Sequence, residues 1–373
     1  MIFLSKPFFN DEELKAIQET FDSGWVAGQG PQGLALSSYI KEDIAVKHAI
    51  PVNNCTAGLH LALLAIGIKE GDEVIVSDFT FPATGHAVLY CGAIPRFVDV
   101  DLYTYNIDPD KIKAKINSKT KAIIVVHAFG LMADMDQIKS IADEYGLKII
   151  EDAACAMGAK YSGKNVGSFG DITCFSLHGR KNVTSGEGGV NVTNNDEYAQ
   201  IMASLSCFGM SSAYSRQTEF AIPSFETLGY NYKLSDINSA IALVQLKRYP
   251  KVLERKRELV AVYNNFLRDN EFLTTPVEPT NFYHVYQSYV VCLDSSLRRN
   301  DLIVSLKRES IQCQIGTYAS HIQPVYNSAD ECPNSLTLYH QTLALPLYFE
   351  LTEEQIATVC SSLNTHIKEQ KNG

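Results

Sequence analysis

The stretch Ser176-Leu177-His178-Gly179-Arg180-Lys181-Asn182-Val183-Thr184-Ser185-Gly186-Glu187-Gly188-Gly189 carries the clearest local signal in the chain. It places Lys181 between an apolar run that predicts a buried strand, Ile172–Phe175, and a glycine-rich turn. Glycines let the backbone pass close to a bound group. A partly desolvated lysine can offer the neutral amine that Schiff-base chemistry needs. A surface lysine beside a β-turn has the same local pattern, so this stretch alone leaves both interpretations open.

Apolar runs on either side of this stretch predict a parallel sheet. Runs that are apolar on both faces suit strands covered by helices on both sides. Helical or turn segments separate them, and this alternation is typical of a mostly parallel α/β domain. The predicted strands are Val74–Val76, Ala122–Val126, Lys148–Ile150, Ile172–Phe175 and Val190–Val192.

The pattern changes near Pro250. A charged helix, Lys251–Arg268, leads to a predicted strand at Tyr289–Leu293 and a helix at Asn300–Arg308. The last helix begins near Thr352 with the spacing of a capping box. We therefore predict a large domain at 1–249, which includes the N-terminal segment, and a smaller C-terminal α+β domain at 250–373, joined by a long helix.

Composition narrows the class of protein. The 373 residues include 32 basic and 42 acidic ones, a net charge of −10, with no basic block, which argues against nucleic-acid binding. Nine scattered cysteines without a CxxC pair indicate reduced thiols and a cytoplasmic location. The start, MIFLSKPFFNDEEL, does not resemble a signal peptide. The most apolar window, Leu59–Ile68, is shorter than the roughly 20 residues that cross a bilayer, so we expect no membrane partner.

A second segment, Ile149-Ile150-Glu151-Asp152-Ala153-Ala154-Cys155-Ala156, ends an apolar strand in two carboxylates. The carboxyl ends of parallel strands face the ligand crevice of such sheets. A carboxylate there can keep a pyridine nitrogen protonated. Taken alone, the segment fits a helix N-cap better, since aspartate is also a good cap.

Two further segments are weaker. Asn53-Asn54-Cys55-Thr56-Ala57-Gly58-Leu59 is a polar turn that opens an apolar helix, and free N–H groups with a hydroxyl at a helix N-terminus can hold a phosphate. Ordinary capping by Asn54 or Thr56 explains the same residues. In Phe79-Thr80-Phe81-Pro82-Ala83-Thr84, an aromatic ring after a strand can stack on a flat cofactor, although a core phenylalanine is the simpler explanation.

Together and in this order, the segments resemble the DegT/DnrJ/StrS-type nucleotide-sugar aminotransferases. These are fold-type I pyridoxal-phosphate (PLP) enzymes of the aspartate aminotransferase superfamily. The resemblance extends over nearly the whole chain. It is also carried by Gly24-Trp25, Val126–Gly130, Ala133–Asp136, Gly229–Asp236, Leu345–Tyr348 and Leu351–Glu354.

The resemblance implies a role for each matching residue. Lys181 would be the Schiff-base lysine and the proton shuttle, and Asp152 would pair with the pyridinium nitrogen. The other residues would contact the cofactor: Thr56, Ala57 and Ser176 at its phosphate, Phe81 on its ring, Cys155 near its ring oxygen, and Asn231 at its phosphate from the partner subunit of a homodimer. No set of metal ligands is implied.

Three positions depart from the common pattern. Cys155 stands where many relatives have Gln or His, and a thiol is a weaker hydrogen-bond partner. Lys233 stands where Arg is frequent, so it lacks the bidentate fork of a guanidinium group. Gly179-Arg180 before the lysine also differs from the best-known members.

The implied reaction is PLP-dependent transfer of an amino group, from glutamate, to a keto group of a nucleotide-linked (deoxy)sugar. Such enzymes serve the biosynthesis of cell-surface polysaccharides, glycans or antibiotic sugars. The alternatives are a PLP-dependent sugar dehydratase, whose relatives replace the lysine that Lys181 retains, and a non-catalytic regulatory protein of the same fold. The nucleotide, the sugar and C3 or C4 amination stay open, and loops 210–227 and 316–326 are candidates for carrying that choice.

Overall fold

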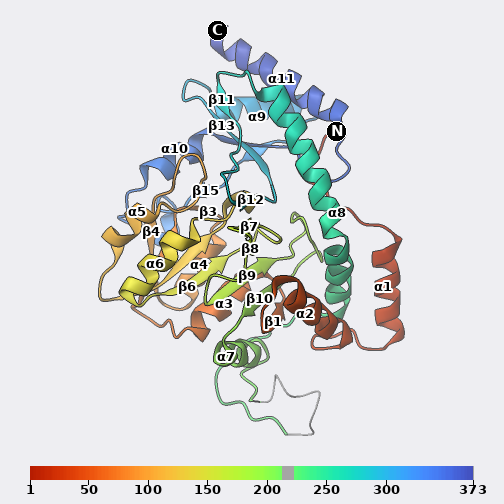
Figure 1. The fold of residues 1–373 in the computed structure, drawn as a ribbon, viewed down its shortest axis with the longest axis vertical. Coiled ribbons are helices and arrows are strands. Elements are labelled where there is room, and N and C mark those ends of the chain that lie inside the picture. The colour runs from red at the N-terminus through yellow and green to blue at the C-terminus, as the bar shows by residue number, and fades with distance from the viewer. Residues whose placement is uncertain (212–221, 373) are drawn as a thin grey trace.

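The computed structural model describes residues 1–211 and 222–372, so loop 210–227 lies partly outside the described residues. Its main element is a seven-stranded sheet in the order β1-β10-β9-β6-β5-β2-β4 (Figure 1). The five strands from β9 to β4 are parallel, β10 pairs antiparallel with β9, and β1 pairs antiparallel with β10, so that β10 alone runs opposite to the other six strands of this sheet. The strands are β1 (His48–Val52), β2 (Glu73–Ser77), β4 (Ile94–Val98), β5 (Thr120–Val126), β6 (Lys148–Asp152), β9 (Ile172–Ser176) and β10 (Gly189–Thr193). The five predicted strands are all present, and the mostly parallel α/β class is confirmed.

Helices cover both faces of this sheet, as predicted. Successive strand residues point to opposite faces, so Ile75 packs in one apolar cluster while Val74 and Val76 pack in another. The helices of the first face are α2 (Pro31–Ile44), α6 (Met135–Tyr145) and the first half of α8 (Asp236–Leu267). Those of the second face are α3 (Cys55–Ala65), α4 (Ala83–Tyr90) and α7 (Asp196–Ser206).

A second, antiparallel sheet follows in the C-terminal part of the chain, at the top of Figure 1. Its order is β11 (Leu273–Thr274), β13 (Tyr289–Leu293), β16 (Thr342–Leu345) and β14 (Gln314–Ile315). Helices α9 (Arg299–Arg308), α11 (Glu353–Asn372) and the second half of α8 share its apolar core. In that core the ring of Tyr263 stacks on Tyr289, with centroids 4.6 Å apart. The predicted α+β character of this part is confirmed.

Short elements complete the described chain. One small sheet has the order β12 (Phe282–Tyr283), β7 (Lys160–Tyr161) and β8 (Lys164–Asn165). In a second small sheet, β15 (Tyr318–Ala319) pairs with β3 (Phe79–Thr80). The remaining helices are α1 (Asp11–Asp22), α5 (Pro109–Ile112), α10 (Pro333–Gln341) and three 3-10 turns at Lys113–Lys115, Ala128–Gly130 and Pro324–Tyr326.

Helix α8 is continuous through Pro250 and connects the two sheets (Figure 1). The charged helix predicted at Lys251–Arg268 is present as the second part of α8, but its predicted start is wrong, because the helix begins at Asp236. Proline lacks the N–H that would bond to the carbonyl of Leu246. The hydroxyl of Tyr39 donates to that carbonyl instead, at 3.4 Å. The domain boundary predicted at 249/250 falls inside this helix and stays a prediction.

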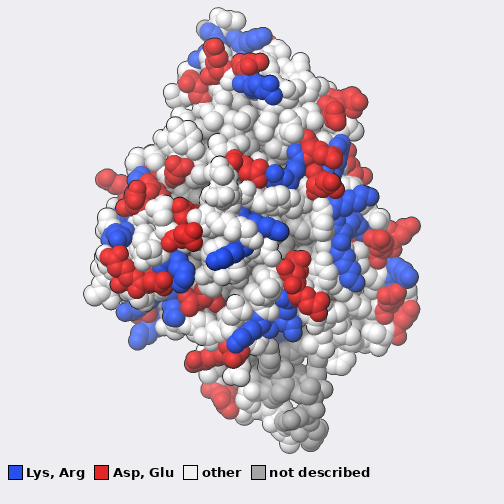
Figure 2. Space-filling view, viewed as in Figure 1, with Lys and Arg blue, Asp and Glu red and all other residues white. Residues whose placement is uncertain are grey.

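The surface carries mixed charges and some exposed apolar side chains. On the face shown in Figure 2, basic and acidic side chains are interspersed. Helix α1 begins with a capping box between Asn10 and Glu13, yet its Leu14 and Phe21 are 66% and 52% exposed. Its apolar stripe therefore does not face the core of this chain. Among the described residues, no helix has both the length and the apolar character needed to cross a bilayer.

Candidate active site

Lys181 lies in the loop that follows β9, and its side chain points toward the end of β6. The loop is closed where Leu177 N–H donates to Gly188 O at 2.9 Å and Ser185 N–H donates to Leu177 O at 2.9 Å. The Lys181 amine lies 3.0 Å from the sulfur of Cys155, just past β6. The strand order explains this meeting, since β9 and β6 are neighbours in the sheet.

Opposing effects act on the Lys181 amine. Burial lowers the pKa of Lys181, but nearby Cys155, Cys55 and Asp152 raise it by more, so the net shift is upward. A protonated amine is not a nucleophile. Lys181 must therefore give up a proton before it attacks an aldehyde, and the sulfur of Cys155 is the hydrogen-bond partner at that nitrogen.

Asp152 is the last residue of β6 and is 5% exposed. Its Oδ2 accepts a hydrogen bond from the Thr84 hydroxyl at 2.8 Å, and its Oδ1 accepts one from Ala154 N–H at 3.2 Å. No helix begins after it in the described residues 153–159, so the alternative role of helix N-cap does not apply. Burial raises the pKa of Asp152, and Thr84, Ala154 and Lys181 lower it only in part. A buried carboxyl of this kind is stabilised as an anion by a cationic partner.

The N-terminus of α3 lies beside the start of β10. Asn54 is its cap, with Oδ1 accepting from Ala57 N–H at 2.8 Å. The Thr56 hydroxyl has no hydrogen-bond partner among the residues that the structure describes. Gly189 permits the close approach, because a Cβ there would lie 2.8 Å from the backbone nitrogen of Cys55. This leaves a helix N-terminus and a hydroxyl able to bind an anion.

Ser176 ends β9, and its Oγ accepts a hydrogen bond from His178 N–H at 3.3 Å. Phe81 is 64% exposed, and its ring meets Tyr318 edge-on at 6.2 Å. It is therefore not the core phenylalanine of the simpler interpretation. Its exposed face is free to stack on a flat ring.

Asn231 is not brought into contact with the other predicted site residues. Its side chain is exposed, and its Oδ1 accepts a hydrogen bond from Lys233 at 2.6 Å. The adjacent backbone does approach the start of α3, where Asn53 N–H donates to Tyr232 O at 2.7 Å. The role predicted for Asn231 across a subunit interface stays a prediction.

Thr84 is not among the predicted site residues, although its hydroxyl holds the Asp152 carboxylate. The local sequence does not single out a threonine in the first turn of α4 as a site residue. Its partner Asp152 lies 68 residues further along the chain. The donor set as a whole fits PLP. It offers an amine for the aldehyde, a buried carboxylate for the ring nitrogen, an aromatic face for the ring and a helix N-terminus for the phosphate.

Comparisons with known proteins support the same class. Residues 7–364 match the DegT/DnrJ/EryC1/StrS aminotransferase family. The spore coat polysaccharide biosynthesis protein SpsC of Bacillus subtilis is 35% identical, over 98% of this chain and 96% of its own. GDP-perosamine synthase of Vibrio cholerae is 32% identical, over 98% of this chain and 99% of its own. The crystal structure of the aminotransferase TlmJ from Streptoalloteichus hindustanus superposes with a TM-score of 0.93 at 28% identity, over 100% of both chains.

These matches confirm the resemblance, the fold-type I architecture, the aminotransferase activity and the dependence on PLP. The chain belongs to the DegT/DnrJ/EryC1/StrS aminotransferase family of PLP-dependent sugar aminotransferases.

Proposed function

We propose that this enzyme transfers an amino group from glutamate to a keto group of a nucleotide-linked (deoxy)sugar. The observation that carries the proposal is the meeting of Lys181, Cys155 and Asp152 at the ends of β9 and β6. The names of two relatives, a GDP-perosamine synthase and a spore coat polysaccharide biosynthesis protein, support a sugar on a nucleotide and a role in polysaccharide, glycan or antibiotic sugar biosynthesis.

Each predicted residue has a task at a stated atom. Lys181 Nζ would hold the cofactor through its aldehyde and, once released, would carry a proton between the substrate carbon and the cofactor. The Asp152 carboxylate, held by Thr84, keeps the ring nitrogen protonated. When bound, PLP supplies the electron sink that this chemistry requires. The N-terminus of α3 would hold the phosphate through Thr56 and Ala57, and Ala57 N–H would exchange its bond to Asn54 Oδ1 for one to the phosphate.

The remaining predicted residues complete the site. Ser176 would add a hydroxyl to the phosphate, Phe81 would cover the ring, and Cys155 would lie near the ring oxygen. Asn231 would reach the phosphate from the partner subunit. None of these tasks needs a metal ion.

A homodimer is part of the proposal, because a C₂ dimer would bring two such sites to one interface. Exposed apolar side chains that could form this interface lie on α1, on α2 and the segment before it, and on the segments near Asn231. They are Leu14, Phe21, Trp25, Leu34, Phe208 and Leu228. A cytoplasmic location is also proposed, since the nine cysteines form no disulfide in the described chain.

The test is a screen of nucleotide keto-sugars with ¹⁵N-amino-labelled glutamate, followed by mass spectrometry of the sugar product. The proposal predicts a product that has gained a labelled amine with the wild-type enzyme and none with Lys181→Ala. A labelled product from Lys181→Ala at the wild-type rate would contradict the role of Lys181. Loss of water from the sugar without gain of nitrogen would instead favour the dehydratase.

A further inference from the structure

The side-chain amide of Gln287 bonds to the backbone on both sides of Lys181. Its Oε1 accepts a hydrogen bond from Asn182 N–H at 2.9 Å, and its Nε2 donates to Arg180 O at 2.6 Å. Gln287 is 9% exposed, and both bonds are partly buried. A single amide thus holds the two peptide groups that orient the Cα–Cβ bond of Lys181.

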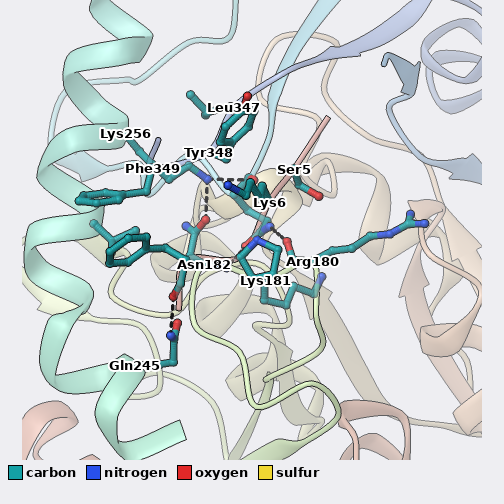
Figure 3. A pocket seen from close by; sticks show the side chains of 14 residues that line it. Ser5, Lys6, Arg180, Lys181, Asn182, Gln245, Lys256, Leu347, Tyr348 and Phe349 are labelled. Atoms are coloured by element: carbon teal, nitrogen blue, oxygen red, sulfur yellow. Dashed lines mark hydrogen bonds between the residues drawn. The ribbon is translucent and has the colours of Figure 1, made fainter. Parts of the chain in front are cut away.

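Asn182 receives a second set of contacts at its side chain. Lys256, from α8, donates to Asn182 Oδ1 at 2.5 Å, as Figure 3 shows beside Lys181. Asn182 Nδ2 donates to Val285 O at 3.2 Å. Lys256 is 3% exposed, and burial lowers its pKa to about 7. The amine also donates to Gln287 O at 3.2 Å, so its partners here are an amide and a backbone carbonyl.

The segment that carries Gln287 is itself fixed to the main sheet. Gln287 N–H donates to Phe129 O at 2.8 Å, and Val285 N–H donates to Gly130 O at 3.1 Å, just past β5. The close approach of residues 285–287 to Gly130 depends on glycine. A Cβ at Gly130 would lie 2.7 Å from Val285 Cγ2 and 3.1 Å from Gln287 N. The φ of Gly130, +101°, also favours glycine. Gln287 is thus anchored to β5, two strands away from β9.

We propose that Gln287 is a positioning residue for Lys181, assisted by Lys256 through Asn182. The two side-chain hydrogen bonds of Gln287 go to the peptide groups on either side of Lys181 and not to its amine. Gln287 would therefore position Lys181 through these peptide groups. The inference rests on the proposed function of Lys181 as the Schiff-base lysine. Its reason is general: a reacting group displaced by about 1 Å can lose roughly 100-fold in rate.

The test compares Gln287→Met, which keeps the length of the side chain but removes both bonds, with the matched control Gln245→Met. Gln245 lines the same small cavity, yet its amide donates to Phe8 O and Glu13 instead of the Lys181 turn. Gln287→Glu is the second variant, because it retains the acceptor for Asn182 N–H while it replaces the donor to Arg180 O with an oxygen and adds a negative charge.

The first readout is amide hydrogen exchange of Asn182 in cofactor-free chain, which needs no activity. Gln287→Met should exchange this amide at least roughly tenfold faster, since an unbonded amide loses its protection. Gln245→Met should leave its rate unchanged. Unchanged exchange in Gln287→Met would overturn the inference, as would equal acceleration in both variants.

The second readout is the split between kcat and KM in cofactor-loaded enzyme. Gln287→Met should lower kcat roughly tenfold with the KM for the sugar within about twofold, and Gln287→Glu should fall between it and wild type. If Gln287→Met does not fold, Gln287→Glu provides both readouts. Borohydride labelling of each variant tests the Schiff-base role of Lys181 separately from the positioning role of Gln287. Label elsewhere would overturn the proposed function, whereas label on Lys181 with wild-type kcat would overturn only the role of Gln287.

Discussion

The Lys181 amine and the Cys155 sulfur form a direct contact of 3.0 Å, in which the amine donates. The sulfur is thus a direct neighbour of the proposed Schiff-base lysine. Burial lowers the pKa of Lys181, and the interaction with Cys155 contributes to raising it.

Cys155→Ala should therefore lower the pH at which the enzyme captures free PLP, because the Lys181 amine would lose a group that favours its charged form. The measurement is the rate of appearance of the visible band against pH. Cys91→Ala is the control, since Cys91 ends α4 and has no contact with Lys181 in the described chain. An unchanged midpoint in Cys155→Ala would show that the sulfur has no electrostatic role.

Asp152→Asn should retain cofactor but lose at least roughly 100-fold in turnover, the scale at which one preorganised electrostatic partner acts. A neutral amide no longer favours the protonated ring nitrogen. Turnover and cofactor content after gel filtration are the two measurements. Asp134→Asn is the control, because Asp134 caps α6 and asparagine caps equally well. Near-normal turnover in Asp152→Asn would mean that Asp152 is only structural.

Lys256 gives a pH dependence to stability. Its pKa is lowered from 10.5 to about 7 by burial, so between these values the unfolded chain binds a proton that the folded chain does not. The free energy of unfolding therefore rises with pH in this window, by up to about 1.4 kcal/mol per unit. Lys256→Met should remove that part of the slope between pH 7.5 and 9.5, as measured by urea unfolding of cofactor-free chain. Parallel slopes for wild type and variant would contradict a neutral buried amine.

Subunit exchange tests the role of Asn231. In a homodimer with shared sites, mixed Lys181→Ala and Asn231→Asp chains form one site with an intact Lys181 and an intact Asn231 from the other chain. Activity should then recover after co-refolding, compared with each variant alone. The backbone contact between Tyr232 and Asn53 offers the contrary arrangement, a site built within one chain. No recovery, together with a monomeric mass by light scattering, would support that arrangement.

Much of the main sheet follows from the sequence, because strands buried on both faces are continuous apolar runs. The two strands that are not predicted, β1 and β4, lie at the two edges of the sheet. Each contains a proline, Pro51 or Pro95, which sheets accept mainly at their edges. Because proline is also common in turns, the local sequence of β1 and β4 does not identify them as strands.

Local sequence also predicts only part of the candidate active site. The places of Lys181 and Asp152 follow from the sequence, because Lys181 comes soon after one apolar strand and Asp152 ends another. Their roles stay predictions that rest on the family resemblance. Thr84, Gln287 and Lys256 cannot be predicted in this way, since each acts on a residue 68 to 105 positions away and carries no local signal. Only the strand order brings them together.

Borohydride reduction of the PLP-loaded enzyme, followed by peptide mapping, tests the central claim most directly. It fixes the cofactor on whichever amine holds it. The site predicts one modified peptide, labelled at Lys181, and no label at that position in Lys181→Ala. Lys256 is the main alternative site for the label, because it is a buried amine with a pKa of about 7 that donates to Asn182, the residue after Lys181. Label on Lys256, Lys164 or Lys233 in the wild-type enzyme would contradict the assignment.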